Sequence, residues 1–350
     1  MNFDELYNVP QWSKNFWNPC ISPIASEILP PILFDNFHSG IKNYNFKWHD
    51  SDTHELFLKQ RELLNPKYHN KEINYTFNAH GYRSESFDTD ANLKIIVLGC
   101  SVAFGTGIDD KDIWSAQLLK LISDKFNKKV KVYNLSIPGA STDLNAITLF
   151  QLIGIIKPNI VLWLPPSSGR RAVNCYYPQE MFKEDIRIEP SSYQHVYNKV
   201  LPSNLKHYPG MENIISDSEN YNNLVKNHAL INEICLNNNA IFKSLHNQLI
   251  LSDAYEYFKY YFSDCVESPR SLIQEHTGIA IDLFYKLDNV INYEDLVTYS
   301  EEFFSTQSKE DIHMDIKYPV SRDNIHQSEL FHKFLAYIAS NLITEKDFHI

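Results

Sequence analysis

The 350-residue sequence has few of the residues that mark several common classes of protein. Its five cysteines are widely spaced and include no C-x-x-C pair, which argues against a disulfide framework or a zinc site and favours a reducing compartment. Basic residues are outnumbered, with 32 Lys and Arg against 43 Asp and Glu, so the net charge of −11 would repel a nucleic-acid backbone. We therefore expect no metal and no nucleic acid as a partner.

Long hydrophobic runs are also missing. The longest apolar stretches, such as 95–99 and 160–166, are far shorter than the ~20 residues that a membrane span requires. The N-terminus reads Met1-Asn2-Phe3-Asp4-Glu5 and has neither the basic start nor the apolar run of a signal peptide. These absences predict a soluble, cytoplasmic protein with no membrane span.

The sequence does contain enough apolar side chain for a large core, since 43% of its residues are hydrophobic and 13% are aromatic. A chain of this length removes roughly 75% of its unfolded surface from water on folding. The length allows two domains, but α/β folds often reach it as one domain with additions. We expect residues 1–90 to form an aromatic-rich extension packed on the core. Residues 91–350 then form the main domain, with a helical insertion at about 171–320.

Short β-rich runs alternate with longer helical patterns in the middle of the chain. Strands are expected at 93–98, 130–135 and 159–164, with helices at 112–126 and 142–156 between them. This alternation predicts βαβ units and a parallel sheet, whose ligands bind at the carboxyl ends of the strands. Later helices are expected at 218–236, 247–263, 270–287, 293–304 and 328–345. At least one or two further strands are expected in the same part of the chain, one of them near 240–245.

The segment after the first expected strand is a candidate for chemistry. It reads Gly99-Cys100-Ser101-Val102-Ala103-Phe104-Gly105-Thr106-Gly107. It lacks the third glycine of a dinucleotide fingerprint, the G-K-[S/T] of a P-loop and the last glycine of the G-x-S-x-G elbow. Ser101 would lie at the carboxyl edge of the sheet, where backbone N–H groups can stabilise an oxyanion, so it is a candidate nucleophile. On this segment alone, an ordinary turn serine remains the alternative.

A serine nucleophile needs a base and a group that orients the base. Four histidines follow an acid by three residues, namely in the pairs Asp35/His38, Glu310/His313, Asp323/His326 and Glu329/His332. Spacing cannot separate these pairs, but placement can. The segment 321–326 is a polar loop that leads into the last expected helix, which favours Asp323 and His326. We expect His332 on that helix and His38 in the aromatic extension.

The segment after the second expected strand reads Asn134-Leu135-Ser136-Ile137-Pro138-Gly139-Ala140-Ser141. Gly139 has no side chain, so its N–H can approach a substrate oxygen closely. Ser141 is a second candidate nucleophile, but a serine directly before a helix is far more often an N-cap. We therefore expect Gly139 to contribute to the site and Ser141 to cap the helix.

Together these segments resemble the SGNH (GDSL-like) hydrolase family. Gly99-Cys100-Ser101 with Gly105 is similar to its first block, Gly139 to its second, and Asp323-Asn324-Ile325-His326 to its last. The resemblance covers roughly 93–169 and 318–345, under a third of the chain. It implies a three-layer, flavodoxin-like α/β fold and a Ser101–His326–Asp323 triad. It also implies an oxyanion hole that includes the N–H groups of Ser101 and Gly139, and no cofactor.

The sequence departs from the family pattern at two places. Cys100 replaces the aspartate before the serine, which leaves the three catalytic roles intact. The third block, G-x-N-D after the third strand, is replaced by Pro165-Pro166-Ser167-Ser168-Gly169-Arg170-Arg171. Its oxyanion asparagine is therefore missing, and loss of one such donor costs about 3 kcal/mol of transition-state stabilisation. Ser167, at the matching offset, is the candidate substitute donor. Arg170 and Arg171 are candidates for substrate binding or for ion pairs with the acidic surface.

These expectations describe a serine hydrolase that cleaves acyl esters of small molecules or carbohydrates, as an esterase or a carbohydrate deacetylase. One alternative is an O-acyltransferase with the same triad, because the segment 78–84 resembles the N-x-x-G-x-R lead-in of longer SGNH-like proteins, some of them carbohydrate O-acetyltransferases. Another is a catalytically weak binding or structural component of a larger assembly, which the missing asparagine and the insertion favour. The sequence specifies no oligomeric state.

Overall fold

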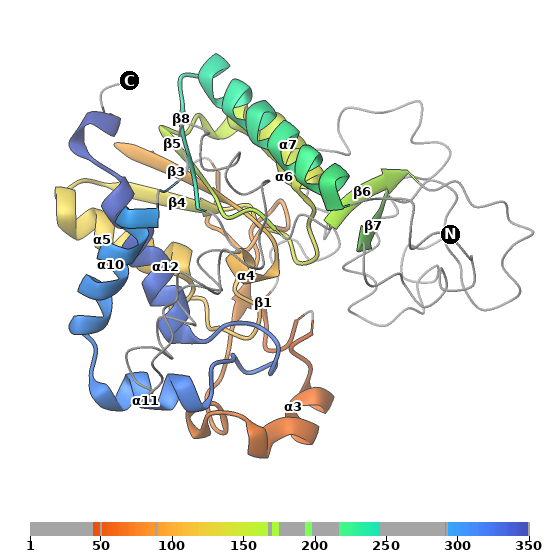
Figure 1. Cartoon of the computed structure of the whole chain (residues 1–350), viewed down its shortest axis with the longest axis vertical. Helices are drawn as coiled ribbons and strands as arrows, with labels where there is room; N and C mark the ends of the chain where they lie inside the picture. The colour runs from red at the N-terminus through yellow and green to blue at the C-terminus, as the bar shows by residue number, and fades with distance from the viewer. Residues whose placement is uncertain are drawn as a thin grey trace, which may run out of the picture.

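The computed structural model describes residues 45–49, 51–87, 90–166, 170–174, 193–197, 217–245, 291 and 293–348. At its centre is a sheet of four strands in the order β4-β3-β5-β8, and all three pairings are parallel. The strands are β3 (Leu93–Leu98), β4 (Val130–Asn134), β5 (Ile160–Trp163) and β8 (Ile241–Ser244) (Figure 1). The strands expected at 93–98, 130–135, 159–164 and 240–245 are therefore confirmed.

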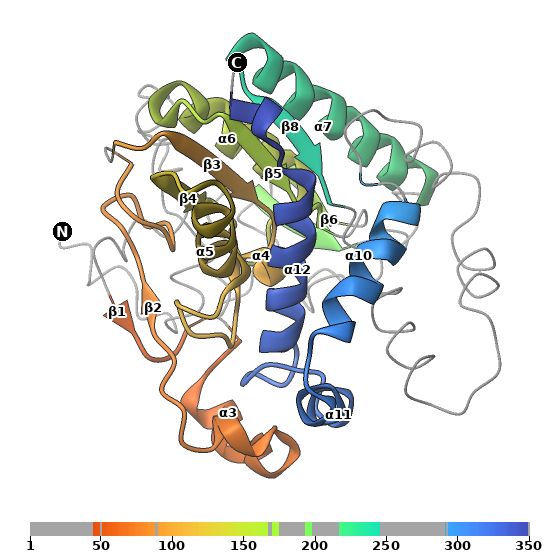
Figure 2. The same cartoon turned by 90° about the vertical axis from the view of Figure 1, so that its left-hand side faces the viewer.

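Two layers of helices cover the sheet (Figure 2). On one face α5 (Trp114–Phe126) packs against α12 (Glu329–Leu342), and on the other α6 (Thr142–Ile156) packs against α7 (Asp217–Asn237). Because both faces are covered, the two central strands β3 and β5 are mostly apolar, and residues 95–98 of β3 are fully buried. The expected three-layer α/β fold is confirmed.

The order of the strands reverses the direction of winding beside β3. From β3 the chain first adds β4 on one side, then crosses to the other side of β3 to add β5 and β8. In such doubly wound sheets a ligand binds at the carboxyl ends of the strands where the direction of winding reverses. That point lies between β3 and β5, and the segment that begins at Gly99 follows β3 directly. The fold therefore brings Ser101 to the position where a ligand is expected.

The described part of the N-terminal extension packs against the helix that follows β3. Its strands β1 (Asn45–Phe46) and β2 (Tyr75–Thr76) pair antiparallel, and α3 (His54–Gln60), η5 (Arg61–Leu63) and η6 (Pro66–Tyr68) lie between them. A small apolar cluster joins Tyr68, Ile73, Tyr75 and Phe77 of the extension to Phe104 of α4 (Ser101–Phe104). The extension thus contacts the segment that carries Ser101.

Residues 217–245 supply α7 and β8, so part of the stretch expected as an insertion belongs to the core of the fold. The helix expected at 293–304 is α10 (Tyr293–Ser305), and it is followed by α11 (Lys309–Lys317), which the sequence did not predict. A separate antiparallel pair is formed by β6 (Arg170–Asn174) and β7 (Tyr193–Tyr197). A last turn, η9 (Glu345–Phe348), ends the described chain. The helices expected at 247–263 and 270–287 lie outside the described residues, and the domain boundaries stay predictions.

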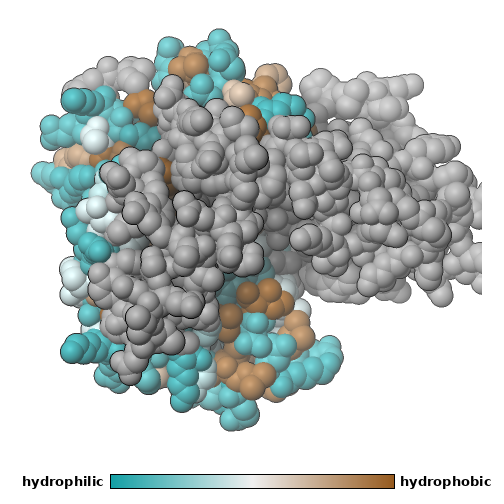
Figure 3. All heavy atoms as spheres, viewed as in Figure 1, coloured by the Kyte–Doolittle hydropathy of each residue, from teal (hydrophilic) through white to brown (hydrophobic). Residues whose placement is uncertain are grey.

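Most described side chains on the face in Figure 3 are hydrophilic, with brown apolar side chains gathered around the position of α3. Leu58 of α3 and Leu63 of η5 are 59% and 65% exposed. None of the described helices combines the length and the apolar composition that crossing a bilayer requires.

Candidate active site

Ser101 is the first residue of α4 and is buried at the carboxyl end of β3. Close packing explains the glycine two residues earlier: a Cβ on Gly99 would lie 2.4 Å from the Cβ of Ala103 and 2.9 Å from the carbonyl oxygen of Leu164. Cys100 is the N-cap residue of α4 and is buried without a side-chain capping bond. The first N–H groups of a helix have no acceptor within the helix. The backbone hydrogen bonds of α4 therefore do not use the N–H of Ser101.

Arg83 holds the loop that follows α4. Its guanidinium is buried and donates to the carbonyl oxygen of Phe104, the last residue of α4 (3.2 Å), and to those of Gly105 (2.7 Å) and Ile108 (2.7 Å) in the loop. It also donates to Asp110 at 2.7 Å. The Asn78 to Arg83 motif therefore has a structural role here, because its arginine shapes the backbone next to Ser101.

Asp323 and His326, which the sequence places in one polar loop, form a hydrogen bond. The Nδ1 of His326 lies 2.6 Å from Oδ2 of Asp323, and the carboxylate of Asp323 is fully buried. Its Oδ1 accepts from the backbone N–H groups of Ile325 and His326 at 3.0 Å each, and the hydroxyl of Ser321 lies 2.8 Å from it. Burial raises the pKa of Asp323, but hydrogen bonds from His326, together with that of Ser51, outweigh burial and lower it to about 2. Asp323 is thus ionised at neutral pH.

Polar contacts hold the loop of this pair against the loop that follows Ser101. The carbonyl oxygen of Ser101 accepts from the N–H of Thr106 at 3.2 Å, and the carbonyl oxygen of Thr106 lies 3.1 Å from the hydroxyl of Ser321. The N–H of Arg322 donates to the carbonyl oxygen of Gly107 at 3.3 Å. The loop 321–326 is therefore docked on the loop that follows Ser101.

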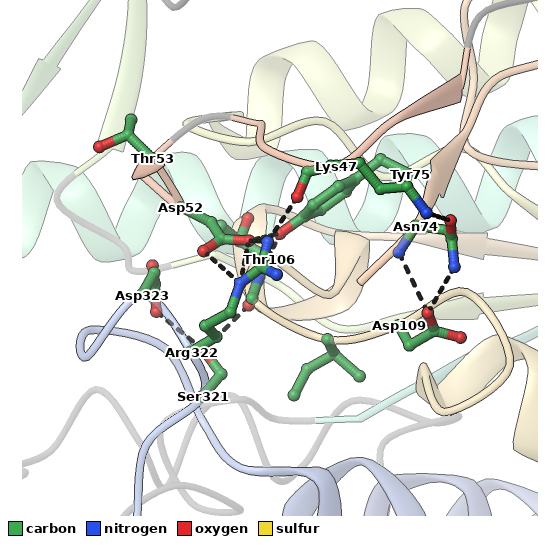
Figure 4. Close-up of polar contacts among 12 residues, drawn as sticks. Lys47, Asp52, Thr53, Asn74, Tyr75, Thr106, Asp109, Ser321, Arg322 and Asp323 are labelled. Atoms are coloured by element: carbon green, nitrogen blue, oxygen red, sulfur yellow. Dashed lines mark hydrogen bonds and ion pairs between the residues drawn. The ribbon is translucent and has the colours of Figure 1, made fainter. Parts of the chain in front are cut away.

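A buried ion pair fixes the loop 321–326 to the N-terminal extension (Figure 4). Arg322 donates from Nε to Oδ1 of Asp52 at 2.9 Å and from Nη2 to Oδ2 at 2.6 Å. The hydroxyl of Tyr75 donates to Oδ2 of Asp52 at 2.5 Å and accepts from the N–H of Gly107 at 2.7 Å. The guanidinium of Arg322 also stacks on Trp48, 3.8 Å from the ring centre. Burial raises the pKa of Asp52, while the bonds from Arg322 and Tyr75 oppose this.

The segment 134–141, which follows β4, contains Gly139 and Ser141. Gly139 has a φ of 75°, a backbone conformation that favours glycine. The hydroxyl of Ser141 accepts from the N–H of Leu144 at 3.2 Å, so Ser141 is the N-cap of α6, as expected. Asn145 ties two strand ends together: it donates to the carbonyl oxygen of Gly99 and accepts from the indole N–H of Trp163 at 2.9 Å. Both the nitrogen and the oxygen of the Asn145 amide are therefore used in structural hydrogen bonds.

The third block contributes less to the described structure. Pro165 and Pro166 follow β5, Ser167 lies outside the described residues, and Arg170 and Arg171 open β6 with side chains that are not described. Their expected roles stay predictions.

Of the other acid and histidine pairs, His332 is on α12 as expected, and its Nδ1 accepts from the N–H of Trp114 at 3.1 Å. Burial lowers the pKa of His332 to about 3. His313 is on α11, while Asp35 and His38 lie outside the described residues.

The sequence does not predict the partners that the N-terminal extension supplies. Ser51, Asp52 and Tyr75 all reach the loops around the site, yet Ser51 and Asp52 are 272 and 270 residues from Asp323 and Arg322. A single sequence carries no signal for such a pairing. In the part of the chain that the structure describes, no three His, Cys, Asp or Glu residues are grouped so as to hold a metal ion.

Comparisons with known proteins give no family. No family profile and no curated protein matches this chain. Among solved structures it is similar to the psychrotrophic esterase EstA from Pseudoalteromonas sp., in a form inhibited by monoethylphosphonate, at 13% identity and a TM-score of 0.34 over 71% of this chain and 94% of that one. It is also similar to TesA, at 14% identity and a TM-score of 0.35 over 71% of this chain and 97% of that one. Likenesses this distant assign no activity to the chain.

The two loops around the site meet so closely at Gly107 that a methyl group there should disrupt them. Gly107 has a φ of +79°, and a Cβ on it would lie 2.2 Å from the hydroxyl of Ser321 and 3.1 Å from the N of Arg322. We expect Gly107→Ala to displace the loop that carries Asp323 and to lower the free energy of unfolding by about 1–3 kcal/mol, measured by urea denaturation.

Gly154 provides the matched control, because a Cβ there meets no atom within 4 Å in the interior of α6. Gly154→Ala should raise the free energy of unfolding by roughly 0.5–1 kcal/mol, since alanine is the better helix former. Equal effects of the two substitutions would contradict close packing at Gly107.

Proposed function

We propose that this protein is a serine hydrolase of acyl esters in which Ser101, His326 and Asp323 form the catalytic triad. The observation that carries the proposal is the buried Asp323 carboxylate, hydrogen-bonded at 2.6 Å to Nδ1 of His326 in a loop docked on the segment after Ser101. A histidine held in this way is the base that a serine nucleophile requires.

Asp323 determines which nitrogen of His326 acts as the base. A carboxylate with a pKa of about 2 is an acceptor only, so Nδ1 of His326 carries the proton of their hydrogen bond. The neutral ring then has its lone pair on Nε2. In the proposed mechanism Nε2 takes the proton of Ser101 as Oγ attacks the ester carbonyl, and it returns that proton to the leaving alcohol. Water then releases the acid from Ser101 by the same steps in reverse.

The developing oxyanion needs donors that are already in place. We assign this role to the N–H groups of Ser101, which opens α4, and of Gly139, which follows β4 with its φ of 75°. Ser167 is the proposed third donor, in place of the asparagine that the third block lacks. Arg170 and Arg171 are proposed to bind the substrate, a small-molecule or carbohydrate ester.

The contacts of Arg83 remove the reason for proposing acyl transfer in place of hydrolysis. The segment 78–84 was the feature that pointed to an acyltransferase, and Arg83 in it donates to the carbonyl oxygens of Phe104, Gly105, Ile108 and Asn74. Its Nε is bonded to Asp110. These contacts give the motif a role in shaping the loop after α4, which a hydrolase needs equally.

A fluorophosphonate probe tests the proposal directly, since it reacts with an activated serine and not with an ordinary one. We expect one probe to attach per folded chain and peptide mapping to place it on Ser101. Heat-denatured protein should not react, because unfolding separates His326 from Ser101. A folded protein that stays unlabelled, or that is labelled on another residue, would refute the triad and would favour a role as a binding component.

A further inference from the structure

Ser51 of the N-terminal extension shares an acceptor with the proposed catalytic histidine. Its hydroxyl donates to Oδ2 of Asp323 at 2.6 Å, and this is the same oxygen that faces Nδ1 of His326. We propose that Ser51 is a positioning residue of the active site, which sets the basicity and orientation of the Asp323 carboxylate. The inference rests on the proposed function, in which Asp323 orients His326.

The geometry aims the hydroxyl of Ser51 at Asp323. Two neighbouring residues of the extension bind two neighbouring residues of the loop: Ser51 binds Asp323, and Asp52 binds Arg322. The Arg322–Asp52 ion pair is buried on both sides, with side-chain exposures of 3% and 0%. It fixes the distance between the two backbones, so the adjacent hydroxyl meets the adjacent carboxylate.

The turn around Ser51 is also closed by backbone hydrogen bonds. The N–H of His49 donates to the carbonyl oxygen of Asp52 at 3.0 Å, and the N–H of Asp52 donates back to His49 at 3.1 Å. The carbonyl oxygen of Ser51 accepts from the N–H of Thr53, at 3.0 Å. Ser51 is therefore held on both sides in the chain, and little freedom is lost when its hydroxyl binds Asp323.

A second donor on Oδ2 has a chemical consequence for His326. Hydrogen bonds to a carboxylate stabilise its charge and make it a weaker base. Without the Ser51 hydroxyl, Asp323 would attract the Nδ1 proton of His326 more strongly and would stabilise the charged imidazolium. Since only the neutral ring can take the proton of Ser101, the enzyme would lose activity at the acid end of its range.

Ser51→Ala tests this role through the pH profile of ester hydrolysis. We expect kcat to fall on the order of tenfold, because the carboxylate that orients His326 loses one charge-assisted hydrogen bond, with KM little changed. The acid limb of kcat/KM should move to higher pH by roughly half a unit, because the imidazolium is stabilised. Ser51→Thr keeps the hydroxyl and should restore both values.

Thr53→Ala is the matched control, because Thr53 lies in the same segment and its hydroxyl caps α3 without contacting Asp323. Thr53→Ala should destabilise the start of α3 and leave the acid limb of the kcat/KM profile unchanged. If Ser51→Ala lowers kcat without moving the acid limb, or if Thr53→Ala moves it equally, Ser51 has only a structural role and the inference is wrong.

A second measurement does not depend on activity. The Nδ1 proton of His326, shared with Asp323, should give the most downfield proton resonance in the NMR spectrum, identified by its loss in His326→Gln. Ser51→Ala should shift this resonance, whereas Thr53→Ala should not. A shift in a protein that the fluorophosphonate leaves unlabelled would reject the proposed function and keep the Ser51 contact. Labelled protein with an unshifted resonance would reject the inference and keep the proposed function.

Discussion

Ser101→Ala is expected to lower kcat/KM for p-nitrophenyl acetate by about 10⁴-fold or more while the protein stays folded. The substitution removes the atom that attacks the ester carbonyl, and what remains of the site can only polarise the carbonyl and bind the ester. The hydroxyl of Ser101 is small and lies at the first position of α4, so its loss opens little space in the core. Initial rates with purified protein, with the circular dichroism spectrum as the check on folding, measure the effect.

Ser141→Ala is the matched control for this experiment. Ser141 also lies at the carboxyl edge of the sheet, after β4, but its hydroxyl caps α6 through the N–H of Leu144. Its loss should cost about 1 kcal/mol of stability and leave kcat/KM close to that of the unchanged protein. Equal turnover by Ser101→Ala and the unchanged protein would eliminate Ser101 as the nucleophile.

The parts of the fold that the sequence predicted are those with a local physical cause. The runs 93–98 and 142–156 match β3 and α6 at both ends. A strand that is covered on both faces is mostly apolar, and the helix is marked by Ser141 at its start and by Pro158 two residues after its last turn. The Asp323–His326 hydrogen bond was predictable because both residues lie in one short polar loop. Each of these features depends on neighbours in the sequence.

The features that the sequence did not predict depend on distant contacts. The pairs Ser51–Asp323 and Asp52–Arg322 join segments at opposite ends of the chain, and the residue types alone do not say which acid will meet which base. Helix α11 was missed for a different reason, since its nine residues are mostly polar. The local signals of its start were Ser308, whose hydroxyl caps α11 through the N–H of Asp311, and the acids Glu310 and Asp311 in its first turn.

Asp52→Ala is expected to be the most destabilising of the substitutions considered, with a loss of about 3–5 kcal/mol in the free energy of unfolding. This loss is not the net contribution of the ion pair to stability, because the cost of removing two charges from water roughly offsets their attraction. It arises because Arg322 would keep its charge in a site only 3% exposed, with no carboxylate opposite it. Tyr75 would also lose the acceptor of its buried hydroxyl. Urea denaturation followed by circular dichroism measures the change.

The Lys59–Glu55 pair on α3 distinguishes this explanation from a general effect of charge. It is a salt bridge of similar length, 2.7 Å, but its side chains are 66% and 79% exposed. Lys59→Ala should therefore leave the stability near that of the unchanged protein, because water replaces the lost partner.

The double variant Asp52→Ala with Arg322→Met should regain much of the stability that Asp52→Ala loses, since no buried charge is then left unpaired. It should not regain esterase activity, because the ion pair also brings Ser51 to Asp323 and holds the loop 321–326 against the extension. This one variant would then be nearly as stable as the unchanged protein but would lack its esterase activity. A double variant as unstable as Asp52→Ala would show that the loss comes from packing around Asp52 and not from the isolated charge of Arg322.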